Sequence, residues 1–213
     1  SACNSLNSIF SKKGLFFNPI YNCVGNEFFK TVHKKSKGES NKFKFIQIGR
    51  FEIIKNQLLV IECLRKIPKE ILDDIEITFI GVGSTLQDAK RLTTLYNLND
   101  KISFMGFVEN FRIPEILTQY DFGLFPSDLE GFGIGAVECM ACGLPVLAQK
   151  NALMEEIIKN YGVLVDKDHF YLGFKEIIEK KYDPQEIMEY AKEFSPSQIK
   201  QKYLTVYRRL LNE

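Results

Sequence analysis

Tryptophan is absent from this sequence of 213 residues, and histidine occurs only at His33 and His169, neither near a recognisable catalytic partner. No apolar run approaches the roughly 20 residues that a membrane-spanning helix needs. The first residues, SACNSLNSIFSKKG, lack the charged segment and apolar core of a signal peptide. The five cysteines are odd in number and scattered, which fits reduced thiols better than a disulfide framework. These absences predict a cytoplasmic protein.

A strong charge of either sign is also lacking, because 28 Lys and Arg residues nearly balance 27 Asp and Glu residues. A net charge of +1 argues against a nucleic-acid partner held by bulk charge, although a local anion site stays open. Hydrophobic residues at 45% and charged residues at 26% are typical of a globular protein. The length predicts one large domain, or one domain with appendages.

Short apolar strands alternate with amphipathic helices through the middle of the chain, a pattern that predicts βαβ units and a parallel sheet. The expected fold class is α/β, a doubly wound Rossmann-like sheet of about six strands with helices on both faces and further helices at the C-terminus. Strands are predicted at 42–49, 75–83, 101–106, 121–127, 144–149 and 162–165. Helices are predicted at 56–67, 86–95, from near Pro114, and at 133–142, 151–160, 168–181, 184–193 and 196–212.

Ligands of such sheets bind beyond the carboxyl ends of the strands, near the topological switch point. Functional residues are therefore expected directly after each strand. The candidate segments are Gly49-Arg50, Gly81–Gly83, Gly106–Val108, Ser127–Gly133 and Gln149–Asn151.

Two cations follow the first predicted strand, Arg50 at its end and Lys55 near the next helix. Beside the N–H groups of a helix start, they could clamp a phosphate group. The residues alone leave a second interpretation open, namely two solvated surface cations.

The segment EGFGIGAVE places Glu130 in the loop after the fourth strand and Glu138 in an otherwise apolar helix. Three glycines between them allow a ligand to approach the backbone, and a helix start favours an anion there. A buried carboxylate needs a partner, and ribose hydroxyls are a natural one. An exposed glutamate on a helix edge is the alternative for Glu138.

Two further patterns have simpler explanations than chemistry. Cys139 and Cys142 form a C-x-x-C inside an apolar helix without a second pair of ligands, which indicates core packing. Asp166 and Asp168 form a D-x-D motif before a predicted helix. Asp168 is predicted to be the N-cap residue of that helix rather than a metal ligand.

Together these motifs resemble the C-terminal, donor-binding domain of the retaining GT-B glycosyltransferases of the large group 1 family (family 4). IGRFEIIKNQ is similar to the family's glycine-arginine stretch, and ITFIGVGSTL and ISFMGFV to its second and third strand ends. DFGLFPSDLEGFGIGAVECMACGLPVLA is similar to its E-x7-E signature, a long and specific match. The resemblance is dense over residues 43–166 and loose outside them.

By this resemblance, Arg50 and Lys55 hold the diphosphate of a nucleotide-sugar donor. Phe107 and Val108 line the base site, partly through backbone, and Glu138 binds the ribose.

The resemblance also assigns Glu130 the catalytic position, facing the donor sugar near its reacting carbon, and places Ile134 near the ribose. Gly49 belongs to the same donor site. Backbone donors to sugar and phosphate come from Gly131, Phe132 and Gly133.

The resemblance further implies that no metal or other cofactor is used and that the anomeric configuration is retained. A UDP-hexose is the favoured donor, and the acceptor is a growing glycan or a lipid-linked sugar, reached in the cytoplasm or at the inner face of the membrane. The chain departs from the family after the fifth strand, where QKNALMEEII replaces a glycine-rich segment that contacts the sugar.

The resemblance divides the chain into three parts: a remnant of an N-terminal domain and linker at 1–30, the donor-binding domain at 31–194, and a helix at 195–213 that packs on an absent N-terminal domain. We expect this chain alone to transfer sugar poorly or not at all. A GT-B nucleotide-sugar epimerase and a non-catalytic nucleotide-sugar-binding module are the competing hypotheses.

Overall fold

The computed structural model describes residues 20–30 and 42–212. The first 19 residues of the predicted N-terminal remnant lie outside this description. Residues 31–41, which carry His33 and most of the polar stretch predicted as a linker, lie outside it as well.

Six parallel strands form one sheet in the order β3-β2-β1-β4-β5-β6. The chain builds outward from β1 to β3, crosses to the other side of β1, and builds outward again from β4 to β6. The two halves diverge between β1 and β4, which is the switch point of a doubly wound sheet. The strands are β1 (Phe43–Ile48), β2 (Ile75–Ile80), β3 (Ile102–Gly106), β4 (Phe122–Phe125), β5 (Val146–Gln149) and β6 (Gly162–Val165).

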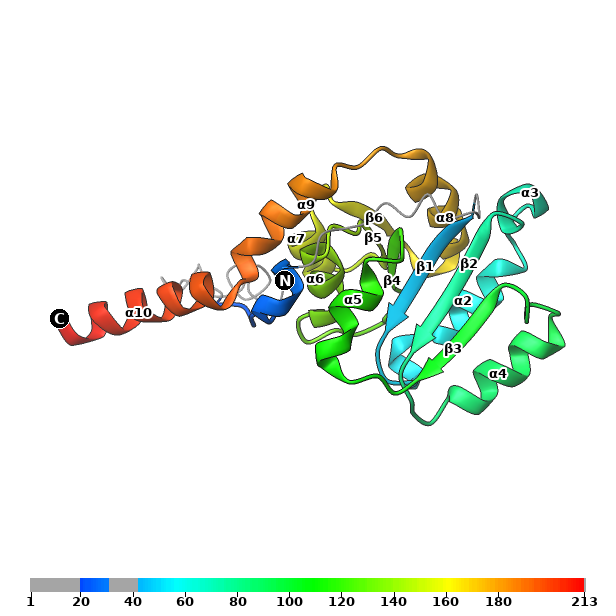
Figure 1. The fold of residues 1–213 in the computed structure, drawn as a ribbon, viewed down its shortest axis with the longest axis horizontal. Coiled ribbons are helices and arrows are strands. Elements are labelled where there is room, and N and C mark those ends of the chain that lie inside the picture. The colour runs from blue at the N-terminus through cyan, green and yellow to red at the C-terminus, as the bar shows by residue number, and fades with distance from the viewer. Residues whose placement is uncertain (1–19, 31–41, 213) are drawn as a thin grey trace, which may run out of the picture.

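Helices cover both faces of this sheet (Figure 1). Successive side chains of a strand point to opposite faces, so Phe45 and Ile46 of β1 enter two separate cores. The Phe45 core is closed by α2 (Gln57–Leu64), α4 (Leu86–Leu95) and α8 (Phe170–Glu179). The Ile46 core is closed by α5 (Ile113–Leu117), α6 (Ile134–Ala141), α7 (Ala152–Ile158) and α9 (Pro184–Ala191).

The predicted fold class is confirmed, and the predicted strands and helices are present with ends within three residues of the expected ones. Local sequence explains several boundaries. Asn151 caps α7 by accepting hydrogen bonds from the N–H groups of Leu153 and Met154, and Pro184 opens α9 directly after the capping residue Asp183. Periodicity missed the shortest elements: α3 (Lys69–Leu72) and the 3-10 turns η2 (Asn26–Lys30), η3 (Ile53–Lys55), η4 (Asn110–Arg112), η5 (Lys167–His169) and η6 (Lys192–Phe194).

The prediction that Asp168 caps a helix is wrong. The turn η5 precedes α8, so His169 occupies the N-cap position and makes no side-chain capping bond. Asp168 lies inside that turn and is exposed. The core-packing prediction for the C-x-x-C is confirmed, because Cys139 and Cys142 are completely buried.

The described N-terminal residues pack on the body of the domain. The N–H of Val24 donates to the Phe194 carbonyl at 3.0 Å, and the Cys142 thiol donates to the Phe28 carbonyl at 3.5 Å. The Tyr21 ring stacks on Phe132 at 5.8 Å between centroids. Residues 20–30 therefore lie against α6 and its preceding loop.

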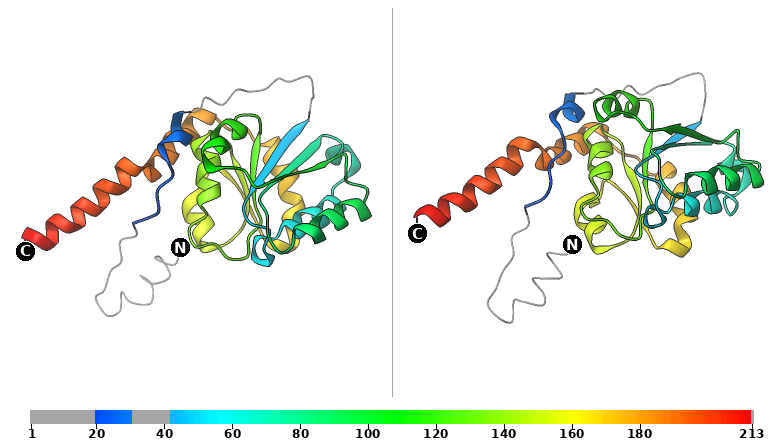
Figure 2. Two further views of the ribbon diagram at one scale, coloured as in Figure 1. Left: turned by 60° about the horizontal axis from the view of Figure 1, so that its bottom comes forward. Right: turned by 90° about the horizontal axis from the view of Figure 1, so that it is seen from below.

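The last helix, α10 (Pro196–Asn212), projects away from the domain (Figures 1 and 2). Large apolar side chains along it stay exposed: Tyr203, Val206, Tyr207, Leu210 and Leu211. Among the residues that the structure describes, no helix has the length and apolar character that a membrane crossing requires.

Gly81 supports the loop that leaves β1. Its φ is +136°, and a Cβ there would stand 2.0 Å from the Gly49 carbonyl oxygen. We predict that Gly81→Ala lowers the free energy of unfolding by about 2–4 kcal/mol, because both the backbone and the neighbouring loop must shift. Urea unfolding measures this change.

The matched control is Gly131→Ala, because a Cβ at Gly131 meets nothing within 4 Å. It should change the free energy of unfolding by about 0.5 kcal/mol or less. Equal effects of the two substitutions would contradict the prediction.

Candidate nucleotide-binding site

A pocket of about 620 Å³ opens at the carboxyl ends of β1 and β4, at the switch point of the sheet. It lies between the loop after β1, the loop from β4 to α6, and the N-terminus of α6. Its lining residues are Asn22, Gln47, Ile48, Gly49, Arg50, Lys55, Asn110, Phe125, Ser127, Glu130, Gly131, Phe132, Gly133, Ile134, Gly135 and Glu138.

Nearly all of the predicted site residues meet in this one pocket. It gathers Gly49, Arg50 and Lys55 from the first loop and residues 130–133 from the second, together with Ile134 and Glu138 from α6. Phe107 and Val108 do not line it: Phe107 is 68% exposed and Val108 is partly buried against the core. Asn110, two residues further along, lines the pocket instead.

A short ion pair joins the two loops. The Lys55 ammonium donates to Glu130 Oε1 at 2.6 Å, and the Glu130 side chain is only 9% exposed. A buried carboxylate requires such a partner, since an unpaired charge is strongly disfavoured away from water. Lys55 thus offsets the charge of Glu130 at a site that also presents Arg50.

Glu138 is held differently. It is the fifth residue of α6 and is 8% exposed, and burial, together with the nearby carboxylate of Glu27, raises its pKa to about 7. Its environment therefore disfavours the charged form. A ligand that donates hydrogen bonds to both carboxylate oxygens would reverse this preference.

The backbone of the second loop is shaped by glycine. Gly133 precedes α6 with φ +79°, and a Cβ there would stand 2.4 Å from Met154 Cε. The glycine therefore lets the start of α6 pack directly on Met154. Gly133, Ile134 and Gly135 line the pocket at this helix start, whose N–H groups favour an anion.

A polar network fixes the two loops to each other. Asn56, at φ +54°, donates to the Pro126 carbonyl at 2.9 Å, and the Asp128 N–H donates to the Ile54 carbonyl at 3.0 Å. The Asp128 carboxylate accepts from Gln149 and Lys167. Partial burial opposes its ionisation, but the hydrogen bonds, led by that from Lys167, outweigh this and lower its pKa.

Sequence reasoning missed Gln47, Asn22 and Asn110. Gln47 had a visible signal, since it is a polar residue in the middle of an apolar strand. Asn22 and Asn110 had none, because only the packing of residues 20–30 and the η4 turn brings them to the pocket.

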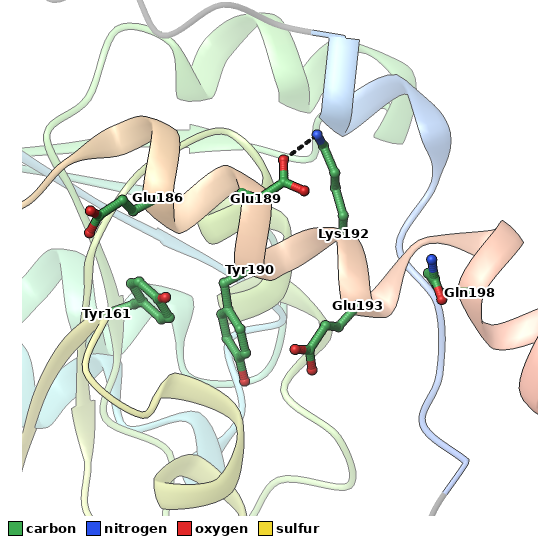
Figure 3. A pocket seen from close by; sticks show the side chains of 7 residues that line it. All are labelled: Tyr161, Glu186, Glu189, Tyr190, Lys192, Glu193 and Gln198. Carbon is green, nitrogen blue, oxygen red and sulfur yellow. Dashed lines mark hydrogen bonds and ion pairs between the residues drawn. The ribbon is translucent and has the colours of Figure 1, made fainter.

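A second hollow lies elsewhere, between α9, α10 and Tyr161 at the amino end of β6 (Figure 3). Three carboxylates line it, and Glu189 pairs with Lys192. Its charge is unsuited to a diphosphate.

The described residues include no group of three or more potential metal ligands. Asp166 and Asp168 are exposed, as is His169, so neither acid of the D-x-D faces the pocket.

A doubly wound α/β domain with a charged pocket at its switch point has the architecture of nucleotide-binding proteins. The chain belongs to the group 1 glycosyl transferases, whose family model matches residues 28–202. It is 29% identical over 146 residues to the N-acetyl-alpha-D-glucosaminyl L-malate synthase of Bacillus anthracis, covering 66% of this chain and 37% of that protein.

Solved structures confirm the fold as one domain of GT-B enzymes. The apo lipopolysaccharide outer core galactosyltransferase WaaB aligns with a TM-score of 0.76 at 18% identity, covering 96% of this chain and 60% of that one. HepE of Anabaena, solved with UDP, aligns with a TM-score of 0.69 at 21% identity, covering 79% of this chain and 49% of that one. This chain therefore spans 37–60% of these proteins.

The raised pKa of Glu138 makes stability depend on pH. Below about pH 4.5 the residue is protonated in both states, and above about pH 7 it is charged in both. Between these values the folded protein binds the proton more tightly, so rising pH lowers the free energy of unfolding.

We predict that Glu138→Gln stabilises the unliganded chain by about 3 kcal/mol at pH 8 and about 1 kcal/mol at pH 5, since one pKa unit corresponds to about 1.4 kcal/mol. Urea unfolding at both pH values measures this difference. Glu70→Gln, on the exposed side of α3, serves as the control and should give no such dependence. Equal stabilisation by Glu138→Gln at the two pH values would contradict the burial argument.

Proposed function

We propose that this chain is the donor-binding half of a retaining glycosyltransferase, which moves a hexose from a nucleotide diphosphate sugar to a glycan or lipid-linked acceptor. The observation that carries the proposal is the convergence of Arg50, Lys55, Glu130 and Glu138 on one pocket at the switch point of the sheet. A UDP-sugar is the proposed donor, and HepE, which has this fold, was solved with UDP.

The proposed roles follow from charge and position. Arg50 and the N-terminus of α6 neutralise the diphosphate, assisted by Lys55, while Glu138 accepts hydrogen bonds from the ribose hydroxyls. The base lies toward Phe107 and Val108, beyond the pocket itself, and Ile134, 44% exposed, packs near the ribose.

Glu130 is the proposed catalytic residue, facing the sugar with its orientation fixed by Lys55. The backbones of Gly131, Phe132 and Gly133 supply donors beside it. Cations and helix N–H groups stabilise the charge that develops on the leaving diphosphate, so the proposal needs no metal or other cofactor.

We further propose that the acceptor binds to a separate domain of a longer protein and that transfer takes place in the cytoplasm or at the inner face of the membrane. The helix α10, which projects from the domain (Figure 1), supports the first part, because Tyr207 and Leu210 in its second half are exposed. The galactosyltransferase WaaB aligns with 96% of this chain and has further length outside the match.

Calorimetry of this chain with UDP, GDP and ADP, all in EDTA, tests the donor role. We predict selective binding of one nucleotide, UDP by the present proposal, and a loss of affinity of about tenfold or more in Arg50→Ala, since a charge-assisted hydrogen bond contributes about 1.5–3 kcal/mol. The matched control is Arg91→Ala, an exposed arginine on α4, which should leave the affinity unchanged. Absence of binding, or binding indifferent to Arg50, would contradict the proposal.

The role of α10 is tested with the pair Tyr207→Asp and Leu210→Asp. Nucleotide affinity of this chain should stay unchanged, because both side chains are exposed and far along the projecting helix. In the longer protein, we predict at least a tenfold lower rate of sugar transfer, measured with an added acceptor, because the apolar contact between domains is lost. Unchanged transfer would remove α10 from the domain contact.

A further inference from the structure

Two glutamines next to the predicted phosphate-binding loop are almost completely buried. Gln47, on β1, is 3% exposed and Gln57, the first residue of α2, is 2% exposed. They flank the loop that carries Arg50 and Lys55, one on each side along the sequence. Neither has a role in the resemblance or in the proposed function.

Each of their side chains forms a hydrogen bond to the far end of this loop, and the two bonds together are called the brace below. Gln47, which precedes the loop, donates from Nε2 to the carbonyl oxygen of Lys55 at 2.9 Å. Gln57, which follows it, donates from Nε2 to the carbonyl oxygen of Arg50 at 2.9 Å. Each predicted cation is therefore held at its backbone by a rigid element on the opposite side of the loop.

The same two side chains each leave an acceptor without a partner. Within the described residues, Oε1 of Gln47 and Oε1 of Gln57 are buried and accept no hydrogen bond. An unpaired buried carbonyl carries a free-energy penalty that an apolar side chain of similar size would avoid. General stability thus does not explain the two amides, whereas the local geometry of the loop does.

The brace matters most for side chains that lack other support. Within the described part of the chain, the Arg50 guanidinium makes no hydrogen bond or ion pair, so its reach into the pocket depends on its backbone. Lys55 pairs with Glu130, so fixing Lys55 also fixes the proposed catalytic carboxylate.

We propose that Gln47 and Gln57 are positioning residues that hold Lys55 and Arg50 where they meet the diphosphate of the donor. This inference rests on the proposed function, because it requires a phosphate group in the pocket. The proposed action of the glutamines is through the backbone of the loop, to which both donate, although Gln47 also lines the pocket.

The test compares UDP with uridine, which carries the same base and ribose without phosphates. Gln57→Leu and Gln47→Leu each remove the donor and the unpaired oxygen at nearly constant size. Each should weaken UDP binding about tenfold by calorimetry, while uridine binding by ligand-observed NMR stays within twofold and the melting temperature does not fall. Thr93→Val, which removes a different buried hydrogen bond on α4, is the control and should change neither affinity.

Double variants separate the effects of the two hydrogen bonds, Gln57 to the Arg50 carbonyl and Gln47 to the Lys55 carbonyl. Gln57→Leu should weaken UDP binding little when Arg50→Ala is already present, because Gln57 acts through Arg50. Gln47→Leu should likewise weaken UDP binding little when Lys55→Met is already present. Full additivity in both cycles would overturn the proposal.

Three other results would also overturn it. Unchanged UDP affinity in both leucine variants, with normal binding and Arg50 dependence in the parent chain, would remove the positioning role and leave the proposed function intact. Equal losses of affinity for UDP and uridine, with a lower melting temperature, would show that the glutamines act only through packing. Gln57→Met and Gln47→Met, which carry unbranched side chains, would check this result. No nucleotide binding by the parent chain would remove the proposed function and the inference together.

Discussion

The divergence of the chain between β1 and β4 is the constraint on which the site depends. Because β1 is followed by a connection to one face of the sheet and β4 by a connection to the other, the two loops separate and leave a crevice between neighbouring strands. Every charged residue of the pocket reaches it from one of these two loops or from the helix α6 that follows the second. The hydrogen bonds of Asn56 and Asp128 join the two loops beside the crevice.

On the proposed function, the pocket must combine two requirements that oppose each other. A diphosphate needs positive charge, whereas the sugar and ribose need carboxylates, and Glu130 and Glu138 are both largely buried. The two carboxylates differ in their charged neighbours. Glu130 has a cation at 2.6 Å, while Glu138 has a second carboxylate, Glu27, as its charged neighbour. Glu138 is therefore a residue whose burial opposes stability until a ligand donates hydrogen bonds to it, as residues kept for binding often are.

The sequence predicted the sheet well because its strands are short apolar runs separated by helical spacing, and covered parallel strands have that composition. It also predicted which loops meet, since the carboxyl ends of neighbouring strands must share one edge. It did not reveal the contact of Lys55 with Glu130, which joins residues 75 positions apart through side-chain geometry. The short turn η5 displaced the start of α8 past Asp168, and the path after β3 put Asn110 rather than Phe107 in the pocket.

The loops around the pocket also expose apolar side chains, notably Ile53, Phe107, Phe111 and Leu129. The second half of α10 exposes further apolar side chains, among them Tyr207 and Leu210, and an exposed apolar surface is typical of a contact with another protein part. On the proposed function, sugar transfer requires water to be kept from the reacting carbon, and an open pocket on a single domain cannot do that. Binding of the nucleotide has no such requirement, because cations and helix N–H groups act on the diphosphate even at a partly solvated site. Nucleotide recognition should therefore belong to this chain by itself, while transfer should depend on whatever covers these apolar surfaces.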